Sequence, residues 1–206
     1  MKTILRSIVL CLLLICINGN VHAQNSNFYT ILDQYFGNHI GNRTHGYGKQ
    51  VWEDGTWYSG HWRFGKMHGR GKMHWSSGAR YSGYWRHGQF YGWGTLRWSS
   101  GDRYTGHWKN GQRCGKGSMQ WHNGNSYKGD WHNDEINGTG EMRWATGSVY
   151  KGGWKNGQMN GDGTMVWANG TSYNGNWLNG VEHGSGVMKY PNGKVVRGTW
   201  NNGKLQ

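Results

Sequence analysis

The chain has 206 residues, a formal net charge of +13 and only 34% hydrophobic residues. Charged, glycine-rich chains of this kind are often disordered, but the 15 tryptophans and 12 tyrosines exclude that interpretation, because disordered chains are poor in aromatic residues. The 38 glycines exclude a helical protein, because each glycine inside a helix costs about 1 kcal/mol relative to alanine.

Residues 1–23 have the pattern of a secretory signal peptide. Lys2 and Arg6 supply a positive start, residues 7–17 are almost all apolar, and Ala23 ends a cleavage-site pattern. The apolar run is too short to be a good membrane span. We therefore expect a chain that is exported (secreted, periplasmic or in a secretory-pathway lumen), begins at Gln24 and has no transmembrane segment.

Removal of that segment changes both the charge and the cysteine count. Without Lys2 and Arg6 the net charge is +11, and Cys114 is the one cysteine left. A single cysteine forms neither an internal disulfide nor a cysteine-based zinc site. Two roles remain open for Cys114, an intermolecular disulfide and a small, partly buried packing residue.

After a lead-in at residues 24–34, residues 35–203 carry a 23-residue repeat, present in about seven copies. Each copy contains Tyr-x-Gly-x-Trp, then Gly-x-Gly, and a second aromatic residue four positions later. The end copies are degenerate, with His39 in a tryptophan position and Val196 in a tyrosine position, as in the caps of repeat arrays. Residues 204–206 form a short tail. The structural aromatic columns comprise Tyr58, Trp62, Trp75, Tyr81, Trp85, Trp98, Tyr104, Trp108, Trp121, Tyr127, Trp131, Trp144, Tyr150, Trp154, Trp167, Tyr173 and Trp177.

Alternation with a period of two inside each repeat predicts two short strands. In the first strand tyrosine, glycine and tryptophan share a face, and in the second strand glycine, methionine or leucine, and tryptophan do so. Pairs such as Asn110-Gly111 and Asp54-Gly55 predict tight hairpin turns. Glycine is expected between the rings because a side chain there would collide with them. We predict an all-β fold, an elongated single-layer antiparallel meander of about 15 strands in stacked β-hairpins.

The sequence Tyr-x-Gly-x-Trp-x-x-Gly, followed after three residues by Gly-x-Gly, resembles the MORN repeat family. The resemblance covers residues 35–203, with six good copies. It implies an elongated, twisted sheet of β-hairpins that acts as a scaffold, a dimerisation module or a membrane-proximal tether. Binding to anionic phospholipids is a further property proposed for the family. This chain differs from most familiar members of the family in its export signal, because those members work in the cytoplasm.

Catalytic and metal-binding patterns are absent from the sequence. It contains no Gly-x-Ser-x-Gly, His-Glu-x-x-His or Walker loop. The acidic pairs 53–54 and 134–135 lie at turns, and adjacent strand residues face opposite ways. His45, His68 and His183 share one column, but neighbouring rows of that column are about 9.5 Å apart, too far to share one ion. We expect no enzyme activity, no metal and no cofactor.

Basic residues concentrate in residues 49–116, which hold 12 Lys and Arg against 3 acidic residues, whereas residues 117–206 hold 8 against 6. Several alternate with the core positions and project from the opposite face, as do Trp57, Tyr84 and Trp93. Arginine beside aromatic residues suits an anionic surface, although a charged outer face also serves solubility. The candidate anion-binding residues are Arg63, Lys66, Arg70, Lys72, Arg80, Arg86, Arg97, Arg103, Lys109, Arg113 and Lys116.

These observations favour a non-enzymatic exported repeat protein that acts as a scaffold, binding a protein partner or itself. The alternative is a peripheral binder of an anionic membrane surface or an acidic polymer through residues 49–116. No nucleic-acid motif is present.

Overall fold

The computed structural model describes residues 38–40 and 43–206, with side chains from residue 45 onward. The expected signal peptide and lead-in, residues 1–34, lie outside the described residues. The strands are β1 (Asn38–Ile40), β2 (Arg43–Val51), β3 (Trp57–Arg63), β4 (Lys66–His74), β5 (Arg80–Arg86), β6 (Gln89–Arg97), β7 (Arg103–Lys109), β8 (Gln112–Gln120), β9 (Ser126–His132), β10 (Glu135–Arg143), β11 (Val149–Lys155), β12 (Gln158–Val166), β13 (Ser172–Leu178), β14 (Val181–Lys189), β15 (Val195–Asn201) and β16 (Lys204–Leu205).

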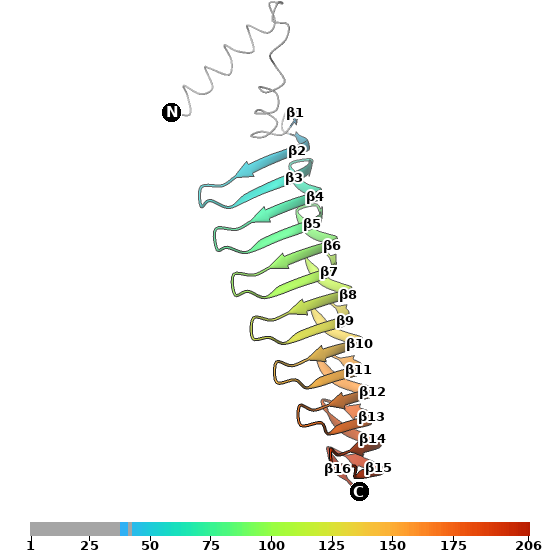
Figure 1. The fold of residues 1–206 in the computed structure, drawn as a ribbon. Helices are drawn as coiled ribbons and strands as arrows, with labels where there is room; N and C mark the ends of the chain where they lie inside the picture. Colours follow the sequence, from blue (N-terminus) through green and yellow to red (C-terminus); the bar gives the residue numbers. More distant parts are fainter. Residues whose placement is uncertain (1–37, 41–42) are drawn as a thin grey trace, which may run out of the picture.

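All 16 described strands form one antiparallel sheet in which each strand pairs with its neighbours in sequence. The sheet is open and elongated, like a twisted ladder with hairpin loops along one side (Figure 1). The described residues form no helix, and none of them therefore makes a helical membrane span. The predicted all-β meander is confirmed, with the two-residue β16 as an addition at the C-terminal end.

Two kinds of turn alternate along the array. The tight turns follow the first strand of each repeat, and both of their central residues have positive φ, as at Asn110 (52°) and Gly111 (81°). The wide turns follow the second strand; at residues 52–56 the Trp52 amide donates to the Thr56 carbonyl. There only Gly55 has positive φ (84°). The prediction of a tight turn at Asp54-Gly55 was therefore wrong, because a three-residue loop closes this end.

Tyrosine and tryptophan rings form a continuous ladder on one face of the sheet. Tyr81 packs edge-on against Trp85 of its own strand at 5.0 Å and against Trp108 of the next repeat at 6.0 Å. This zigzag recurs from Tyr58 to Trp200. Its tyrosines are at most 1% exposed, and edge-to-face ring pairs add stability beyond that of buried area. The tyrosines and the tryptophans of this zigzag therefore form the core, and the second tryptophan column (Trp75, Trp98, Trp121, Trp144 and Trp167) is partly buried and packs against it.

Each tyrosine ring lies flat on two glycines of neighbouring strands. A Cβ on Gly83 would lie 2.5 Å from Gly94 Cα and 2.5 Å from the Tyr81 hydroxyl oxygen. The Tyr81 hydroxyl donates to the Tyr84 carbonyl at 2.9 Å, and this bond recurs in the other repeats. Glycine is thus required at these positions for two reasons. A side chain would collide with the tyrosine ring, as predicted, and it would also collide with the backbone of the opposite glycine.

Side chain to backbone hydrogen bonds join successive wide turns, and we call each such bond a turn latch. The His122 amide donates to Asp102 Oδ1 at 2.7 Å, and equivalent bonds reach Ser76, Ala145 and Ala168 from the side chains twenty residues earlier. The latch is missing where Ala79 supplies no side-chain acceptor and where Pro191 supplies no N–H. The turns therefore contribute to the contact between repeats.

Candidate binding groove

Two depressions hollow the face of the sheet opposite the Tyr–Trp ladder, and we call this the groove face. One, of about 1070 Å³, spans strands from β6 to β12, and the other, of about 690 Å³, spans β2 to β6. Trp93 on β6 lines both. The two depressions therefore adjoin at Trp93 and together extend along most of the array.

Small polar and charged residues form the floor of the groove. They come from the positions directly after the ladder tyrosines and their cross-strand partners, so the backbone register places them in one column that crosses the sheet. The column consists of Lys49, Ser59, Lys72, Ser82, Thr95, Thr105, Ser118, Lys128, Glu141, Lys151, Thr164 and Asn174. Short side chains at most of these positions leave the depression open.

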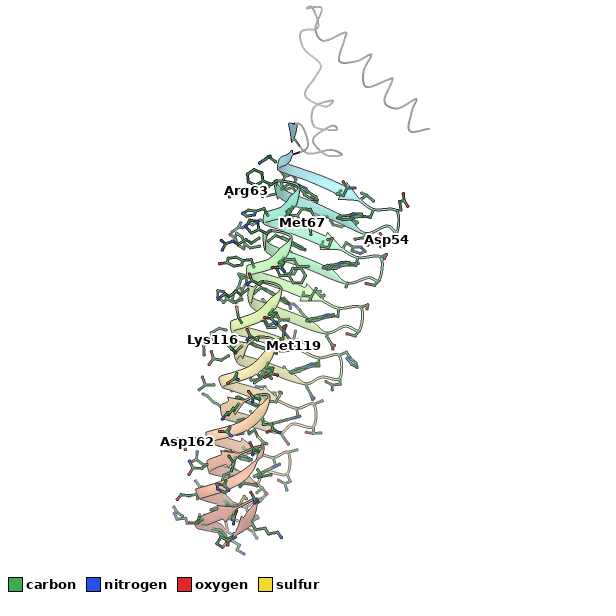
Figure 2. The ribbon with its side chains drawn as sticks, turned by 180° about the vertical axis from the view of Figure 1, so that it is seen from behind. Asp54, Arg63, Met67, Lys116, Met119 and Asp162 are labelled. Atoms are coloured by element: carbon green, nitrogen blue, oxygen red, sulfur yellow. The ribbon has the colours of Figure 1, made fainter. Side chains whose placement is uncertain are left out.

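A second column, two residues nearer the tight turns on each strand, changes its chemistry along the array. In the N-terminal half it contains Tyr47, His61, Arg70, Tyr84, Trp93, His107 and Lys116. In the C-terminal half the equivalent positions hold Asp130, Thr139, Gly153, Asp162 and Asn176. Lys116 and Asp162, two repeats apart, lie along the edge opposite the wide-turn edge that carries Asp54 (Figure 2). The groove is aromatic and basic at one end and polar and acidic at the other.

The exposed aromatic residues of the groove are held by basic neighbours. The Arg70 Nε donates to the Tyr84 hydroxyl at 2.8 Å, and the guanidinium lies 5.1 Å from the ring centroid. Trp93, half exposed, packs edge-on against His107 at 5.0 Å. Rings that are oriented by neighbours and open to solvent are pre-ordered contact surfaces, and tryptophan, tyrosine and arginine dominate protein interfaces.

Lys116 and Asp130 mark the transition between the two chemistries. Lys116 Nζ lies 2.8 Å from Asp130 Oδ1, and Thr139 donates to the same carboxylate through its amide and hydroxyl, each at 2.9 Å. Burial alone would raise the pKa of Asp130, but the Lys116 and Thr139 hydrogen bonds lower it overall. Lys116 is therefore already paired, unlike the groove cation Lys72 of the preceding repeats.

The structure divides the predicted anion-binding residues among several places. Arg70, Lys72 and Lys116 line the groove. The residues near the tight turns are Arg63, Lys66, Arg86 and Lys109, and those beside the wide turns are Arg80, Arg97 and Arg103. The sequence-based set therefore falls into separate patches of the groove face, one in the depressions, one near the tight turns and one beside the wide turns.

Arg113 does not join these patches. Its position opposite Trp108 places it on the Tyr–Trp face, where its guanidinium lies 4.5 Å from the Trp131 ring centroid. Its Nε donates to Asp134 Oδ1 at 2.9 Å. In other repeats this position holds Met67, Phe90 or Met159, which pack against the core. Arg113 is thus a packing residue. Alternation continued from Met119 and Gly117 also places Arg113 on the Tyr–Trp face, but the candidate set was chosen by charge alone.

Cys114 and the histidine column show no assembled chemistry. Cys114 is a free, half-buried thiol on β8, and burial raises its pKa, which disfavours the reactive thiolate. Within residues 45–206, no three His, Cys, Asp or Glu side chains gather closely enough to hold a metal ion. His68 packs edge-on against His87 at 5.6 Å near a tight turn.

Fold and surface define an open repeat array of β-hairpins with a long groove on one face. The MORN repeat family model matches residues 35–57, 58–80, 81–103, 104–126, 127–149, 150–172 and 173–195. The chain belongs to the MORN repeat family, as its sequence motifs predicted, and carries seven tandem repeats. None of the curated proteins matches the chain significantly.

Solved structures show a weaker likeness. The TCP10c domain of Drosophila melanogaster Sas-4 is 12% identical, with 73% of this chain and 90% of that chain covered and a TM-score of 0.42. The SAS-4 (dCPAP) TCP domain of Drosophila melanogaster, in complex with a proline-rich motif of Ana2 (dSTIL), is 14% identical, with 79% and 97% covered and a TM-score of 0.37. Both TM-scores are below 0.5, too low to establish a common fold.

Proposed function

We propose that this protein is a non-enzymatic, exported scaffold whose groove face binds a protein partner. The observation that carries the proposal is the groove that continues past Trp93 on the face left uncovered by the Tyr–Trp ladder. An extended segment of a partner can follow such a groove along the array, because the repeats offer equivalent positions at each step. The export follows from the residues 1–23 pattern alone.

The N-terminal half of the groove carries the strongest contacts. Tyr47, Tyr84 and Trp93 are 60%, 39% and 50% exposed, although burial of large aromatic rings is strongly favourable. Buried aromatic and arginine anchors supply most of the energy of protein interfaces. These rings are therefore the expected anchor points for the partner.

Selection from a random-peptide display library on the purified protein tests this proposal. Peptides that bind should lose affinity about tenfold or more when Trp93 is replaced by serine, as expected for an interface anchor. The matched control is Val166→Ser, which removes a comparably exposed apolar side chain from β12 in the C-terminal half. Equal binding by wild type and Trp93→Ser would contradict the proposal, as would failure to select any peptide.

The alternative is peripheral binding to an anionic membrane. Residues 49–116 favour it, because they contain 12 basic residues and only 3 acidic ones. Co-sedimentation with anionic and neutral vesicles at low and physiological salt tests it. Binding to anionic vesicles that persists at physiological salt would favour the membrane reading. Absence of binding to vesicles would exclude the membrane alternative and leave a protein partner as the ligand of the groove.

A further inference from the structure

Three arginines form an unbroken row across neighbouring strands of the groove face. The backbone register pairs Arg80 on β5 with Arg97 on β6, and Arg97 with Arg103 on β7. His74 on β4 extends the row opposite Arg80. Directly opposite side chains on neighbouring strands are close, and like charges in such positions repel one another.

No acidic side chain of residues 45–206 neutralises this row. The four ion pairs that the structure describes there use Arg113, Lys116, His122 and Arg143, and none uses Arg80, Arg97 or Arg103. Arg103 Nε is also buried without a hydrogen-bond partner. That nitrogen is closed to solvent, whereas Arg80 and Arg97 are exposed and Arg103 as a whole is half-buried. The row therefore presents guanidinium donors that the chain itself does not satisfy.

The same row in the C-terminal half has a different composition. The positions equivalent to Arg80 and Arg97 are occupied there by residues such as Val149 and Val166, which lie opposite each other. Its one arginine, Arg143, is paired with Glu141 at 2.6 Å. Repeat geometry alone does not require arginine at these positions, so the unpaired row is a local property of strands β5–β7.

The row borders the aromatic part of the groove. Ser82 and Thr105 line the depressions two residues after Arg80 and Arg103 on the same strands and the same face. The row crosses the strands, so successive arginines follow the long axis of the array at steps of about 4.8 Å. A linear chain that runs along this border of the groove therefore meets all three guanidinium groups in succession.

We propose that Arg80, Arg97 and Arg103 bind the carboxylates of an acidic, extended segment of the protein partner, an inference that rests on the proposed scaffold function. The planar guanidinium matches a carboxylate with two parallel hydrogen bonds, which fixes the position of the segment along the groove. Tyr84 and Trp93, four residues from Arg80 and Arg97 on the same strands and the same face, contact its apolar side chains. The site thus selects a segment in which acidic and aromatic or aliphatic residues are neighbours.

Fluorescence anisotropy with a labelled polyglutamate peptide tests the row. The triple variant Arg80→Gln/Arg97→Gln/Arg103→Gln should weaken binding of a peptide of about ten residues by tenfold or more. The matched control Lys66→Gln/Lys109→Gln/Lys155→Gln removes the same charge from exposed positions beside the tight turns and should weaken it less than about threefold. Thermal melting checks that both variants stay folded.

Equal weakening by the two triple variants would overturn the inference, because net charge alone would then explain binding. Binding of heparin or anionic vesicles through the row, without binding of polyglutamate, would overturn the peptide as its occupant. If the row variant still binds peptides from the display selection, only this inference fails. If no peptide binds the wild-type protein, the proposed function fails as well.

Discussion

The N-terminal and C-terminal halves of the array share one backbone and one core but present different groove surfaces. Tyr81 in one half and Tyr150 in the other are both buried on paired glycines, with the same edge-on tryptophan contacts. At the groove, Trp93 and Tyr84 in the first half correspond to Asp162 and Asn176 in the second. The fold thus constrains one face of each strand and leaves the other free to carry binding chemistry.

High pH should unfold both halves of the array together, and we expect this to be the largest effect on stability. Burial raises the pKa of all six ladder tyrosines, with that of Tyr150 at about 12. Because the folded pKa exceeds the unfolded value near 10, this contribution is complete below pH 10 and is lost as pH rises further. Each tyrosine removes up to about 1.4 kcal/mol of stability per pH unit in that range.

Thermal melts followed by circular dichroism between about pH 8 and 12, with tyrosinate absorbance recorded in parallel, measure this loss. We expect a falling melting temperature above pH 10, with most tyrosinate appearing on unfolding. Ionisation of the ladder tyrosines near pH 10 without loss of structure would show that the rings are not buried.

Removal of a ladder tryptophan should cost the two halves equally. Trp85 and Trp177 are each 4% exposed, so Trp85→Ala and Trp177→Ala should each lower the free energy of unfolding by about 3–5 kcal/mol. Urea denaturation measures both variants. A large loss for one variant and almost none for the other would contradict the common core.

A methyl group at the glycine pair should act in the same way but less strongly. Gly83→Ala brings a Cβ within 2.5 Å of the Gly94 backbone, and Gly152→Ala brings one within 2.4 Å of Gly163. Overpacking of this kind costs about 1–3 kcal/mol. The control is Ser77→Ala, which places an alanine at an exposed turn position and should leave the urea midpoint almost unchanged. Unchanged urea midpoints for both glycine variants would refute the close approach.

The turn latches should have the smallest effect on stability. Hydrogen bonds from the His122 amide and side chain lower the pKa of Asp102, so its contribution is present above about pH 4 and is lost as pH falls through the folded pKa. Asp102→Ala should lower the melting temperature by about 2–4 °C at neutral pH. Conversely, Ala79→Asp supplies the missing acceptor and should raise it. If both changes leave it unaltered, the latches do not stabilise the array.

The sequence was sufficient for the architecture because one strict period repeats the same physical constraints. Positive φ at Asn110-Gly111 and burial of the tyrosine column followed from local patterns, whereas the second tryptophan column is only partly buried. The core column of Met67 and Phe90 and the packing of Arg113 were missed, although alternation continued past the Gly-x-Gly pair places all three on the Tyr–Trp face. The bulge shifts the register by two residues and so leaves that face unchanged.

The arginine row could be predicted from the sequence only in part. Arg80, Arg97 and Arg103 were all predicted as candidate anion-binding residues of the basic segment 49–116, but their direct opposition depends on the register across two strand pairs. The lack of acidic partners is likewise a property of the assembled surface, because Asp102, adjacent to Arg103 in sequence, is taken by His122.

Binding of a partner should depend on groove residues that the fold leaves free. The direct test is binding of library-selected peptides to the groove exchange Tyr84→Asn/Trp93→Asp, which places the residues of the C-terminal half in the N-terminal half, with Asn176→Tyr/Asp162→Trp as the reciprocal exchange. The account predicts that the first exchange loses peptide binding about tenfold or more while its melting temperature stays close to that of wild type. Peptide binding that survives this exchange in the folded protein would contradict the account.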